Sequence, residues 1–414
     1  MNAEPIVITG VGVLAANGLG RRAFWNALEA GVSGIGHVTR FDASALPCQI
    51  AGELWDFNPE DFMRKRDIRN WHRNVHQAVA SARLAIEDAE LSSAGYDPER
   101  VATGFGTSVG SPNEIWEEQT QAYEVDGYRK VNKFASSAFA GHSSTVHVSI
   151  DCGFRGSAIT ISSGCSTGLD VVAWGVQQIQ TGKADAALVG ATEAPIFVMS
   201  FAGACSLGIL SKRNDAPSEA MRPFDEKRDG IVLSEGAAAL VLERADRARA
   251  RGAPIYAEIG GFGSAAEAAN PLILDRKGVS LARAIRQAMD NAGVTPADID
   301  CVQCHGVSLD MYDLCETNAY KAALEKWAYR IPFSASKSMI GQSYAAGGML
   351  GVAANLLSLT EGVVPPTINL EAPAAECDLD YAPRKARYND VRTAMTVSMS
   401  FGGTHSAVVL RSPN

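Results

Sequence analysis

One cysteine stands where a protein would place a nucleophile. In the stretch GSAITISSGCSTGLDVV (residues 156–172), a β-branched apolar run ends at Ser162, and a small-residue corner then carries Cys165. A helical apolar pattern follows, so Cys165 is expected at a helix N-terminus, where backbone N–H groups and the helix dipole favour a thiolate. Gly164 and Gly168 leave room for a second molecule or a second backbone. Covalent catalysis is one interpretation, and a buried structural cysteine is the other.

Three further segments carry side chains that such chemistry requires. His305 stands in CHGVS, Lys337 in SASKSMIGQ and Phe401 in SFGGTH. Each lies where a strand-like run gives way to a loop or helix, which is where α/β sheets build their sites. Alone, a histidine there is more often structural and a lysine more often solvated. Together with Cys165, at corresponding places in two halves of the chain, they predict one active site.

Strand-like and helix-like runs alternate along the whole chain. The runs IVITGVGV and RRAFWNALEAG open an order that IYAEIGGFG and LARAIRQAMDNAG resume after residue 254. This repeat predicts an internal duplication, with the nucleophile in an N-terminal half at 1–254 and the other site residues in a C-terminal half at 255–414. Strands alternating with helices favour an α/β fold with a mostly parallel, covered sheet in each half.

Composition narrows the class of protein. The 414 residues carry a formal net charge of −9, which disfavours nucleic acid as a partner. No apolar run approaches the about 18 residues that a membrane span needs, and no signal-peptide pattern is expected at the N-terminus. Eight irregularly spaced cysteines then indicate reduced thiols in a cytoplasmic protein rather than a disulfide framework.

Two short motifs suggest cofactors but lack the context that those cofactors need. TGVGVLA (residues 9–15) resembles a dinucleotide fingerprint, but a turn at residues 17–18 interrupts it, and no acidic residue ends a strand about 20 residues later. CVQCH (residues 301–305) spells a haem-attachment pattern that belongs to exported proteins, and it lacks two further ligands at zinc-like spacing. We therefore expect neither a bound cofactor nor a metal.

Five motifs taken together are specific. They are GCSTG at Cys165, SKRNDAPSEAMRPFDEKRDGIVLSEGAAALVLE at 211–243, HG at His305, SKSM at Lys337 and SFGGT at Phe401. With them the chain resembles, from Ile6 to Leu410, the β-ketoacyl-acyl-carrier-protein synthases, the elongating enzymes of fatty-acid and type II polyketide assembly in the thiolase superfamily. The resemblance implies a duplicated thiolase-like fold, with two β/α halves packed as α-β-α-β-α layers, and a dimer.

The resemblance also implies a reaction in two half-steps. Cys165 would take an acyl group from the phosphopantetheine of an acyl carrier protein, and the backbone N–H groups of Cys165 and Phe401 would form the oxyanion hole. A malonyl group on a second carrier protein would then lose CO2, and the resulting carbanion would attack the acyl-enzyme. His305 would hydrogen-bond the malonyl thioester carbonyl while the enolate develops. No separate cofactor is implied.

Supporting roles follow from the same resemblance. Lys337 matches the family lysine, with Glu316 as its charge partner and Asp313 nearby in the same motif. Phe401 matches a residue that gates the acyl pocket. Val109, in GTSVGS, falls where a branched residue lines that pocket.

Several positions depart from the family pattern. Where KSM-x-GH has a second active-site histidine, this chain has Gln342, which can donate an N–H but cannot act as an acid, a base or a cation. Val307 and Leu309 replace two threonines that would face the pantetheine arm, and His405 replaces an asparagine. These departures indicate a specialised synthase, and they leave open an acyltransferase that loads Cys165 without extending the chain.

The carrier protein of this family is acidic, so an acidic chain needs a local basic cluster to bind it. Basic residues gather in two stretches, Arg64, Lys65, Arg66, Arg69 and Arg73 in the first and Arg129 and Lys130 in the second. A solvated face is the plainer interpretation of either. Both a homodimer and a heterodimer with a chain-length-factor-like subunit fit the resemblance. The nucleophile at Cys165 argues against this chain being the non-enzymatic subunit.

Overall fold

The computed structural model describes residues 4–110, 112–135 and 140–413. The N-terminal half contains strands β1 (Ile6–Ala15), β2 (Gly18–Leu19), β3 (Gly36–His37), β4 (Ile50–Ala51), β5 (Val101–Gly106), β6 (Ala158–Ile161), β7 (Ala186–Glu193) and β8 (Gly236–Arg244). The C-terminal half contains β9 (Ala257–Ala266), β10 (Cys301–Gln303), β11 (Phe333–Ser334), β12 (Val363–Val364), β13 (Arg387–Tyr388), β14 (Thr393–Met399) and β15 (Thr404–Arg411).

The helices fall between these strands. In the first half they are α1 (Arg21–Ala30), α2 (Lys65–Asn70), α3 (Arg73–Asp88), α4 (Pro112–Asp126), α6 (Ser143–Cys152), α7 (Thr167–Gln180), α8 (Val198–Ser206) and α9 (Ala245–Ala250). In the second half they are α10 (Val279–Ala292), α11 (Asp310–Leu324), α12 (Lys337–Ile340) and α13 (Tyr344–Glu361).

The strand order is the same in both halves. It runs β1-β8-β7-β5-β6 in the first half and β9-β15-β14-β10-β11 in the second. In each half the first three strands are antiparallel and the last three are parallel. The chain therefore repeats one topology, and β1 pairs with β9 over two residue pairs to join the halves into one sheet. The division between residues 254 and 255 stays a prediction.

The expectation of a mostly parallel sheet in each half was wrong, because the sheet is mixed. A parallel neighbour requires a long crossover, whereas β14 and β15 are joined by four residues, and so short a connection permits only an antiparallel pair. The prediction of covered strands was correct for the central ones: every residue of β1, β5 and β7 is buried. Strands covered on both faces read as continuous apolar runs, which is how these three read.

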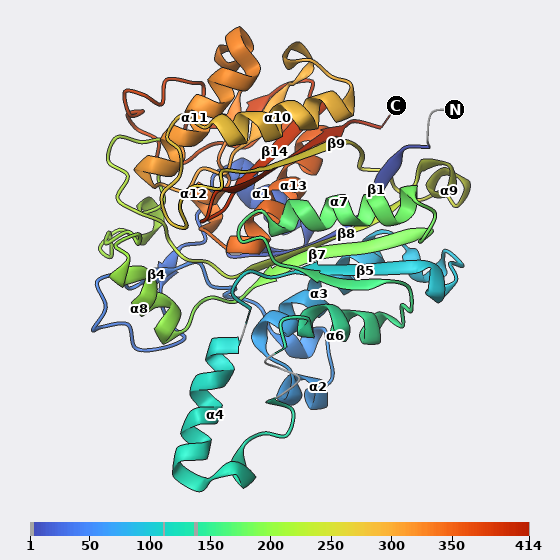
Figure 1. The fold of residues 1–414 in the computed structure, drawn as a ribbon, viewed down its shortest axis with the longest axis vertical. Coiled ribbons are helices and arrows are strands. Elements are labelled where there is room, and N and C mark those ends of the chain that lie inside the picture. The colour runs from blue at the N-terminus through green and yellow to red at the C-terminus, as the bar shows by residue number, and fades with distance from the viewer. Residues whose placement is uncertain (1–3, 111, 136–139, 414) are drawn as a thin grey trace.

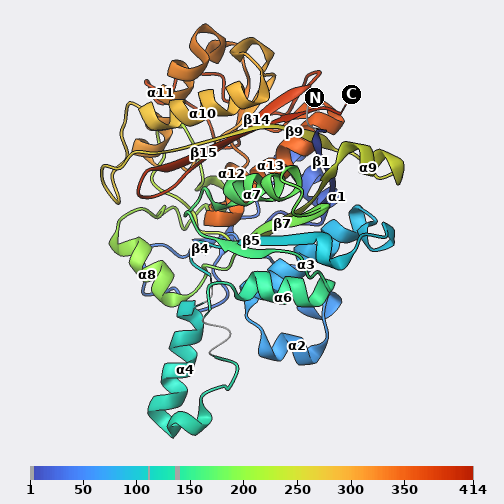
Figure 2. The ribbon, with the colours of Figure 1, turned by 45° about the vertical axis from the view of Figure 1, so that its right-hand side comes forward.

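Helices and strands alternate in layers, as Figure 1 shows. Helices α3 and α6 pack on the N-terminal strands from one side, and α10 packs on β9 and β15 from the opposite side. Between the two sets of strands lie α7 and α13, which contact each other, and α13 contacts strands of both halves. Almost all of α13 is buried, which explains why its sequence is apolar on every side. Helix α4 projects from the body in both ribbon views (Figures 1 and 2).

Glycines in β1 serve this packing and not a cofactor. A Cβ on Gly10 would lie 2.2 Å from the carbonyl oxygen of Ala85, and one on Gly12 would lie 2.0 Å from that of Ser81. Both carbonyls belong to α3, so the glycines let this helix approach the strand. The dinucleotide interpretation of residues 9–15 has no support here. None of the helices in the described part of the chain combines the length and the apolarity that a membrane crossing requires.

Candidate active site

Cys165 lies in the turn between β6 and α7, at the centre of the layered body. Gly164 has φ +66°, and a Cβ there would lie 2.9 Å from that of Ser400, so the tight corner requires glycine. A Cβ on Gly168 would lie 2.6 Å from the backbone nitrogen of Met349 in α13. The room that Gly168 leaves is therefore filled by a second backbone.

The charge state of Cys165 differs from the sequence expectation. The residue is only 4% exposed, and burial raises the pKa of its thiol to about 12, while the cation of Lys337 opposes that rise. Helix α7 begins two residues later, at Thr167. The helix terminus thus does not outweigh desolvation in the free protein, and Cys165 rests as a thiol.

Gln342 makes a direct contact with Cys165. Its Nε2 donates to Sγ of Cys165 at 3.3 Å, and its Oε1 is buried without a hydrogen-bond partner among the described residues. The backbone N–H of Gln342 donates to the carbonyl of Val232 at 2.8 Å, and the N–H of Ser234 donates to the carbonyl of Gln342 at 3.0 Å. The side chain is therefore positioned by a fixed backbone.

His305 and Lys337 form a second buried pair. Lys337 Nζ lies 3.0 Å from Nδ1 of His305 and donates to its carbonyl oxygen at 2.6 Å. The backbone N–H of Met399 also donates to Nδ1, at 3.3 Å. Since an ammonium and an amide both donate to Nδ1, the ring proton must lie on Nε2. Nε2 is buried and has no partner among the described residues, so its N–H is available to a ligand.

Burial decides the protonation of this pair. It lowers the pKa of His305 well below its ordinary value, and the adjacent Lys337 cation lowers it further. Burial also lowers the pKa of Lys337 to about 8, with Cys165 and Glu316 opposing the shift. At neutral pH the arrangement is a neutral imidazole held by an ammonium.

Glu316 does not hold Lys337 as the sequence led us to expect. Its carboxylate accepts the backbone N–H groups of His305 at 2.5 Å and Gly306 at 2.8 Å, and the Tyr320 hydroxyl at 2.6 Å. These described side chains form no direct ion pair between Glu316 and Lys337, and the carboxylate acts on the lysine through its field alone. The backbone donors are closer because the loop after β10 folds over α11. Glu316 therefore positions His305.

Asp313 lies one turn earlier on α11 and anchors the same loop. It accepts the backbone N–H of Val307 at 3.1 Å and that of Phe224 at 2.8 Å, and the guanidinium of Arg228 lies 3.6 Å away. Burial raises its pKa to about 7. Val307 is thus buried with its backbone bonded to the aspartate, where the family has a threonine.

The end of β14 contacts both the turn that carries Cys165 and the His305–Lys337 pair. Ser398 Oγ donates to the carbonyl of Cys165 at 2.6 Å, and Ser400 Oγ donates to the carbonyl of Ser163 at 2.7 Å. Ser400 Oγ also accepts the backbone N–H of Ser166 at 2.8 Å. Because the adjacent Met399 contacts His305, one strand end fixes the turn of Cys165 and the imidazole together.

A cavity of about 630 Å³ opens beside Cys165. Val109 and Phe401 both line it, as the sequence led us to expect of a pocket, and Tyr344 lines it as well. Phe401 is half-buried, and its ring packs edge-on against Tyr312 with 5.5 Å between centroids. Most other lining side chains are apolar, among them Met199, Leu207 and Ile209, with Trp116 from the projecting helix α4.

Comparison with known proteins decides the family. Residues 3–248 match the beta-ketoacyl synthase N-terminal domain, and residues 256–371 match the beta-ketoacyl synthase C-terminal domain. The chain belongs to the beta-ketoacyl synthase family.

Individual relatives cover the chain throughout. It is 40% identical over 415 residues to the tetracenomycin polyketide synthase ketoacyl synthase alpha subunit of Streptomyces glaucescens, covering 99% of this chain and 97% of the relative. It is 36% identical over 410 residues to the 3-oxoacyl-[acyl-carrier-protein] synthase 2 of Coxiella burnetii, covering 99% of both. The solved ishigamide ketosynthase/chain length factor superposes with a TM-score of 0.92 at 31% identity, covering 100% of both chains.

Glu193, at the end of β7, is a site residue that sequence reasoning missed. Its carboxylate accepts the Thr107 hydroxyl and the backbone N–H groups of residues 108–110, all at 2.8–3.0 Å, and the N–H of Ala345 at 3.2 Å. It thereby fixes the loop that carries Val109 and the start of α13. Burial raises its pKa, and the donors oppose that rise. Its only sign in the sequence was an acidic residue at the end of a mostly apolar strand.

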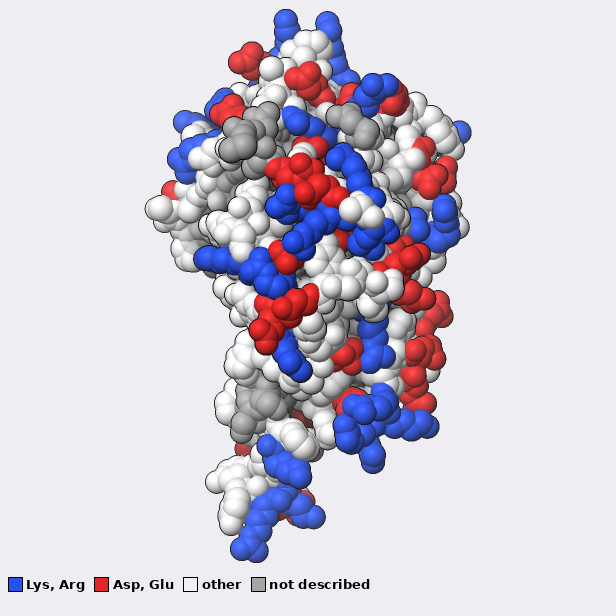
Figure 3. All heavy atoms as spheres, turned by 90° about the vertical axis from the view of Figure 1, so that its right-hand side faces the viewer, with Lys and Arg blue, Asp and Glu red and all other residues white. Residues whose placement is uncertain are grey.

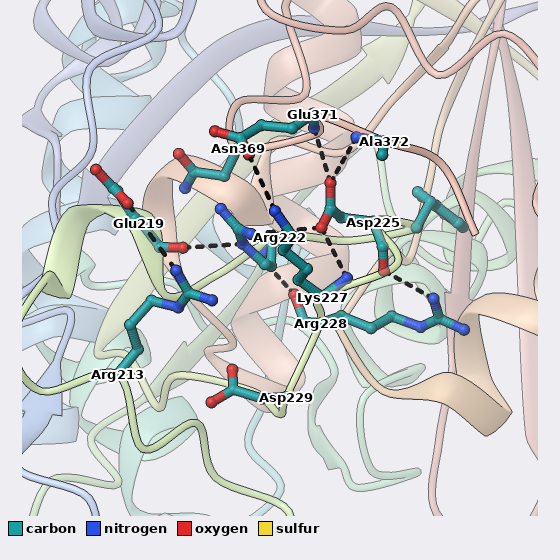
Figure 4. Close-up of polar contacts among 12 residues, drawn as sticks. Arg213, Glu219, Arg222, Asp225, Lys227, Arg228, Asp229, Asn369, Glu371 and Ala372 are labelled. Carbon is teal, nitrogen blue, oxygen red and sulfur yellow. Dashed lines mark hydrogen bonds and ion pairs between the residues drawn. The ribbon is translucent and has the colours of Figure 1, made fainter.

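A second network of hydrogen bonds, centred on Arg222 and Asp225, holds the loop that follows His305. Arg222 is 2% exposed and lies 3.4 Å from Asp225, and its backbone N–H donates to the Ser308 hydroxyl at 2.6 Å. Asp225 also accepts the backbone N–H groups of Glu371 at 2.7 Å and Ala372 at 3.0 Å, as Figure 4 shows. The long family motif at 211–243 thus supplies structure around the site.

The predicted basic residues lie away from this centre. Arg64, Lys65, Arg66 and Arg69 are exposed on and beside α2. Figure 3 shows Lys and Arg side chains gathered along the lower edge of the body, the level of α2 in Figure 1, and on the projecting arm below it. The exposed pair at residues 129–130 lies on that arm, beyond α4.

Arg73 does not belong to the exposed cluster. Its guanidinium forms a double hydrogen bond with the buried carboxylate of Glu235, one of the two contacts at 2.7 Å. The Arg73 side chain is therefore paired inside the fold and does not contribute to the exposed basic surface. His405, another of the departures, pairs through Nε2 with a carboxylate oxygen of Glu267 at 2.8 Å. Within the described part of the chain, no group of three His, Cys, Asp or Glu side chains is placed to hold a metal ion.

Proposed function

We propose that this chain condenses an acyl group held on Cys165 with a malonyl unit carried by an acyl carrier protein, by decarboxylative Claisen chemistry. One observation carries the proposal. His305 is neutral, its Nδ1 is occupied by Lys337 and Met399, and its Nε2–H is buried without a partner. Such a donor is suited to an oxygen that becomes negative during the reaction.

In the first half-reaction, Cys165 sulfur forms a bond to the acyl carbonyl carbon and the bond to the pantetheine sulfur breaks. The thiol proton of Cys165 ends on the departing pantetheine, so the exchange is neutral overall. Gln342 Nε2, 3.3 Å from the sulfur, stabilises the developing thiolate. The backbone N–H groups of Cys165 and Phe401 serve as the oxyanion hole in this proposal. The cavity lined by Val109 takes the acyl chain.

In the second half-reaction, the malonyl group loses CO2 and its electron pair passes to the α-carbon. The thioester carbonyl oxygen takes up negative charge as an enolate, and His305 Nε2–H donates to it. Lys337 keeps the imidazole in that tautomer and adds a positive charge beside it. The carbanion then attacks the acyl carbonyl, and Cys165 leaves as a thiolate that is protonated again. The product is a β-ketoacyl thioester on the carrier protein.

Gln342 favours a second candidate, a transferase that loads Cys165 and passes the acyl group on without extension. An amide can donate an N–H here but cannot carry the positive charge of an imidazolium. Loss of one aimed donor in such a site costs about 10²–10³ in rate, and a neutral donor retains part of that.

Partner proteins follow from two surfaces. The exposed basic residues at 64–66 and 69 fit an acidic carrier protein, although Asp67 pairs with Arg64 and Arg66. The edge strand β6 exposes its first two residues, and Ile150 on the neighbouring helix α6 is 68% exposed. An exposed, partly apolar sheet edge of this kind is suited to pairing with a second subunit, either a copy of this chain or a chain-length-factor-like partner.

The cysteines bear on the setting of the protein. Eight unpaired cysteines support a cytoplasmic setting without a disulfide framework.

Intact mass of the protein, incubated with an acyl-carrier-protein thioester and then with malonyl-carrier protein, tests the function. We expect one acyl group on wild type, none on Cys165→Ala, and an unchanged yield on Cys205→Ala, which removes another free thiol. Release of CO2 with a β-ketoacyl product supports condensation. A persistent acyl-enzyme without CO2 supports transfer alone. Absence of acylation, with a substrate that a control synthase accepts, refutes catalysis by the isolated chain and directs the test to a mixture with a partner subunit.

A further inference from the structure

Tyr344 opens α13 in a conformation that its side chain disfavours. Its φ is +39°, a region that glycine adopts freely and bulky residues avoid. The neighbouring backbone is fixed, because the N–H of Ala345 donates to Glu193 and the N–H of Gln342 is bonded to Val232. Strain maintained in this way at a large side chain gathers at functional sites. The surrounding contacts therefore hold Tyr344 in a backbone conformation that costs free energy.

The phenol lines the same cavity as Cys165. Like Ile209, it is partly buried and packs against the apolar cluster that includes Leu210, and its hydroxyl has no hydrogen-bond partner among the described residues. Burial, with the charges of Cys165 and Glu193, raises its pKa well above its ordinary value. The group is thus a neutral O–H donor near the nucleophile.

We propose that Tyr344 is a specificity-determining residue, whose hydroxyl donates to an oxygen on the acyl chain close to the thioester. The inference rests on the proposed function, because it requires an acyl group on Cys165. The cavity walls are mostly apolar, so a chain oxygen that enters loses its water and needs a donor. A saturated chain leaves the phenol unpaired. The protein therefore prefers a chain oxygenated at its β-carbon over a saturated one.

The test compares two pantetheine thioesters, octanoyl and 3-oxooctanoyl, as acyl donors to Cys165. The second-order rate constant of Cys165 acylation is measured by intact mass for wild type and for Tyr344→Phe. This substitution removes only the hydroxyl and keeps the ring, and thermal unfolding verifies the fold. Ser200→Ala is the matched control, since it removes another hydroxyl from the wall of the same cavity.

We expect wild type to prefer the 3-oxo donor, and Tyr344→Phe to lose about 5- to 30-fold of that preference, while Ser200→Ala keeps it. An unchanged ratio in Tyr344→Phe, with acylation intact, overturns the role of Tyr344 and leaves the proposed function standing. An equal loss for both donors also overturns it, because the hydroxyl would then act on the thiol or the thioester itself. If neither donor acylates wild type, the proposed function fails and this inference fails with it.

Discussion

Replacement of Glu193 by glutamine is expected to destabilise the protein and to slow acylation of Cys165. Five donors meet this carboxylate, three at Oε1 and two at Oε2. A glutamine oxygen at the Oε1 position keeps three hydrogen bonds. Its NH₂ group then faces the backbone N–H groups of Ser108 and Ala345, so two hydrogen bonds become donor–donor contacts. In the alternative orientation the Thr107 hydroxyl can turn to accept from the NH₂ group, and the backbone N–H groups of Val109 and Gly110 lose their acceptor, so again two hydrogen bonds are lost.

The size of the effect follows from this count. A hydrogen bond to a charged group contributes about 1.5–3 kcal/mol, so two lost bonds lower the free energy of unfolding by about 3–6 kcal/mol. In a chain of this length we expect the melting temperature to fall by about 3–7 °C. Acylation is expected to slow because the loop of Val109 and the start of α13 lose their common anchor.

Thermal unfolding and the acylation rate of Glu193→Gln are measured beside Glu87→Gln, an exposed carboxylate on α3 whose loss should change neither quantity. A Glu193→Gln variant that melts within 1–2 °C, roughly, of wild type would refute the reasoning. It would mean that water or a shifted backbone satisfies the donors. A variant that loses stability but loads Cys165 at the wild-type rate would separate the anchor from the site.

Three further predictions concern the site and its surroundings. The rate of malonyl decarboxylation by the acyl-enzyme should fall as pH rises through about 8, because Lys337 then loses the positive charge that it places beside His305, and Lys337→Met should show no such step in its pH profile. Gln342→Ala should slow acylation of Cys165 about 10-fold at a fixed donor concentration, and an unchanged rate would exclude the Nε2 contact from the reaction. Arg222→Met should lower the free energy of unfolding by about 3 kcal/mol or more, as measured in urea, because it leaves the buried carboxylate of Asp225 without its cation.

Much of the architecture followed from apolar periodicity. Runs such as residues 186–191 are apolar because strands covered on both faces have no polar side, and the helical spacing of residues 281–293 placed α10 to within two residues at each end. The direction of neighbouring strands did not follow, since periodicity reports which faces are covered and not how strands pair. The mixed sheet, and its joining through β1 and β9, therefore differ from the expectation.

The candidate site was predicted unevenly. The structure brings together Cys165, Gln342, His305 and Lys337, whose types and motifs the sequence displays. Glu193 and Tyr344 gave little or no signal, because a single acidic residue after a strand, or a single tyrosine before a helix, has many ordinary explanations. Arg73 was misassigned to the exposed cluster, since a basic residue in a run looks solvated until its partner 162 residues away is known.

The sequence alone determined which reactive groups are present and where they lie along the chain: a cysteine in a tight glycine corner, an imidazole and an amine after later strands, and a chain that repeats its order of elements. These are local properties, because residue type, spacing and glycine content fix the reactive groups and the turns that display them. The tertiary structure alone decided their states. Burial holds Cys165 as a thiol and His305 as a neutral ring, and Lys337 and Met399 place the ring proton on Nε2. Desolvation and long-range contacts set protonation, and both exist only after distant segments have packed together.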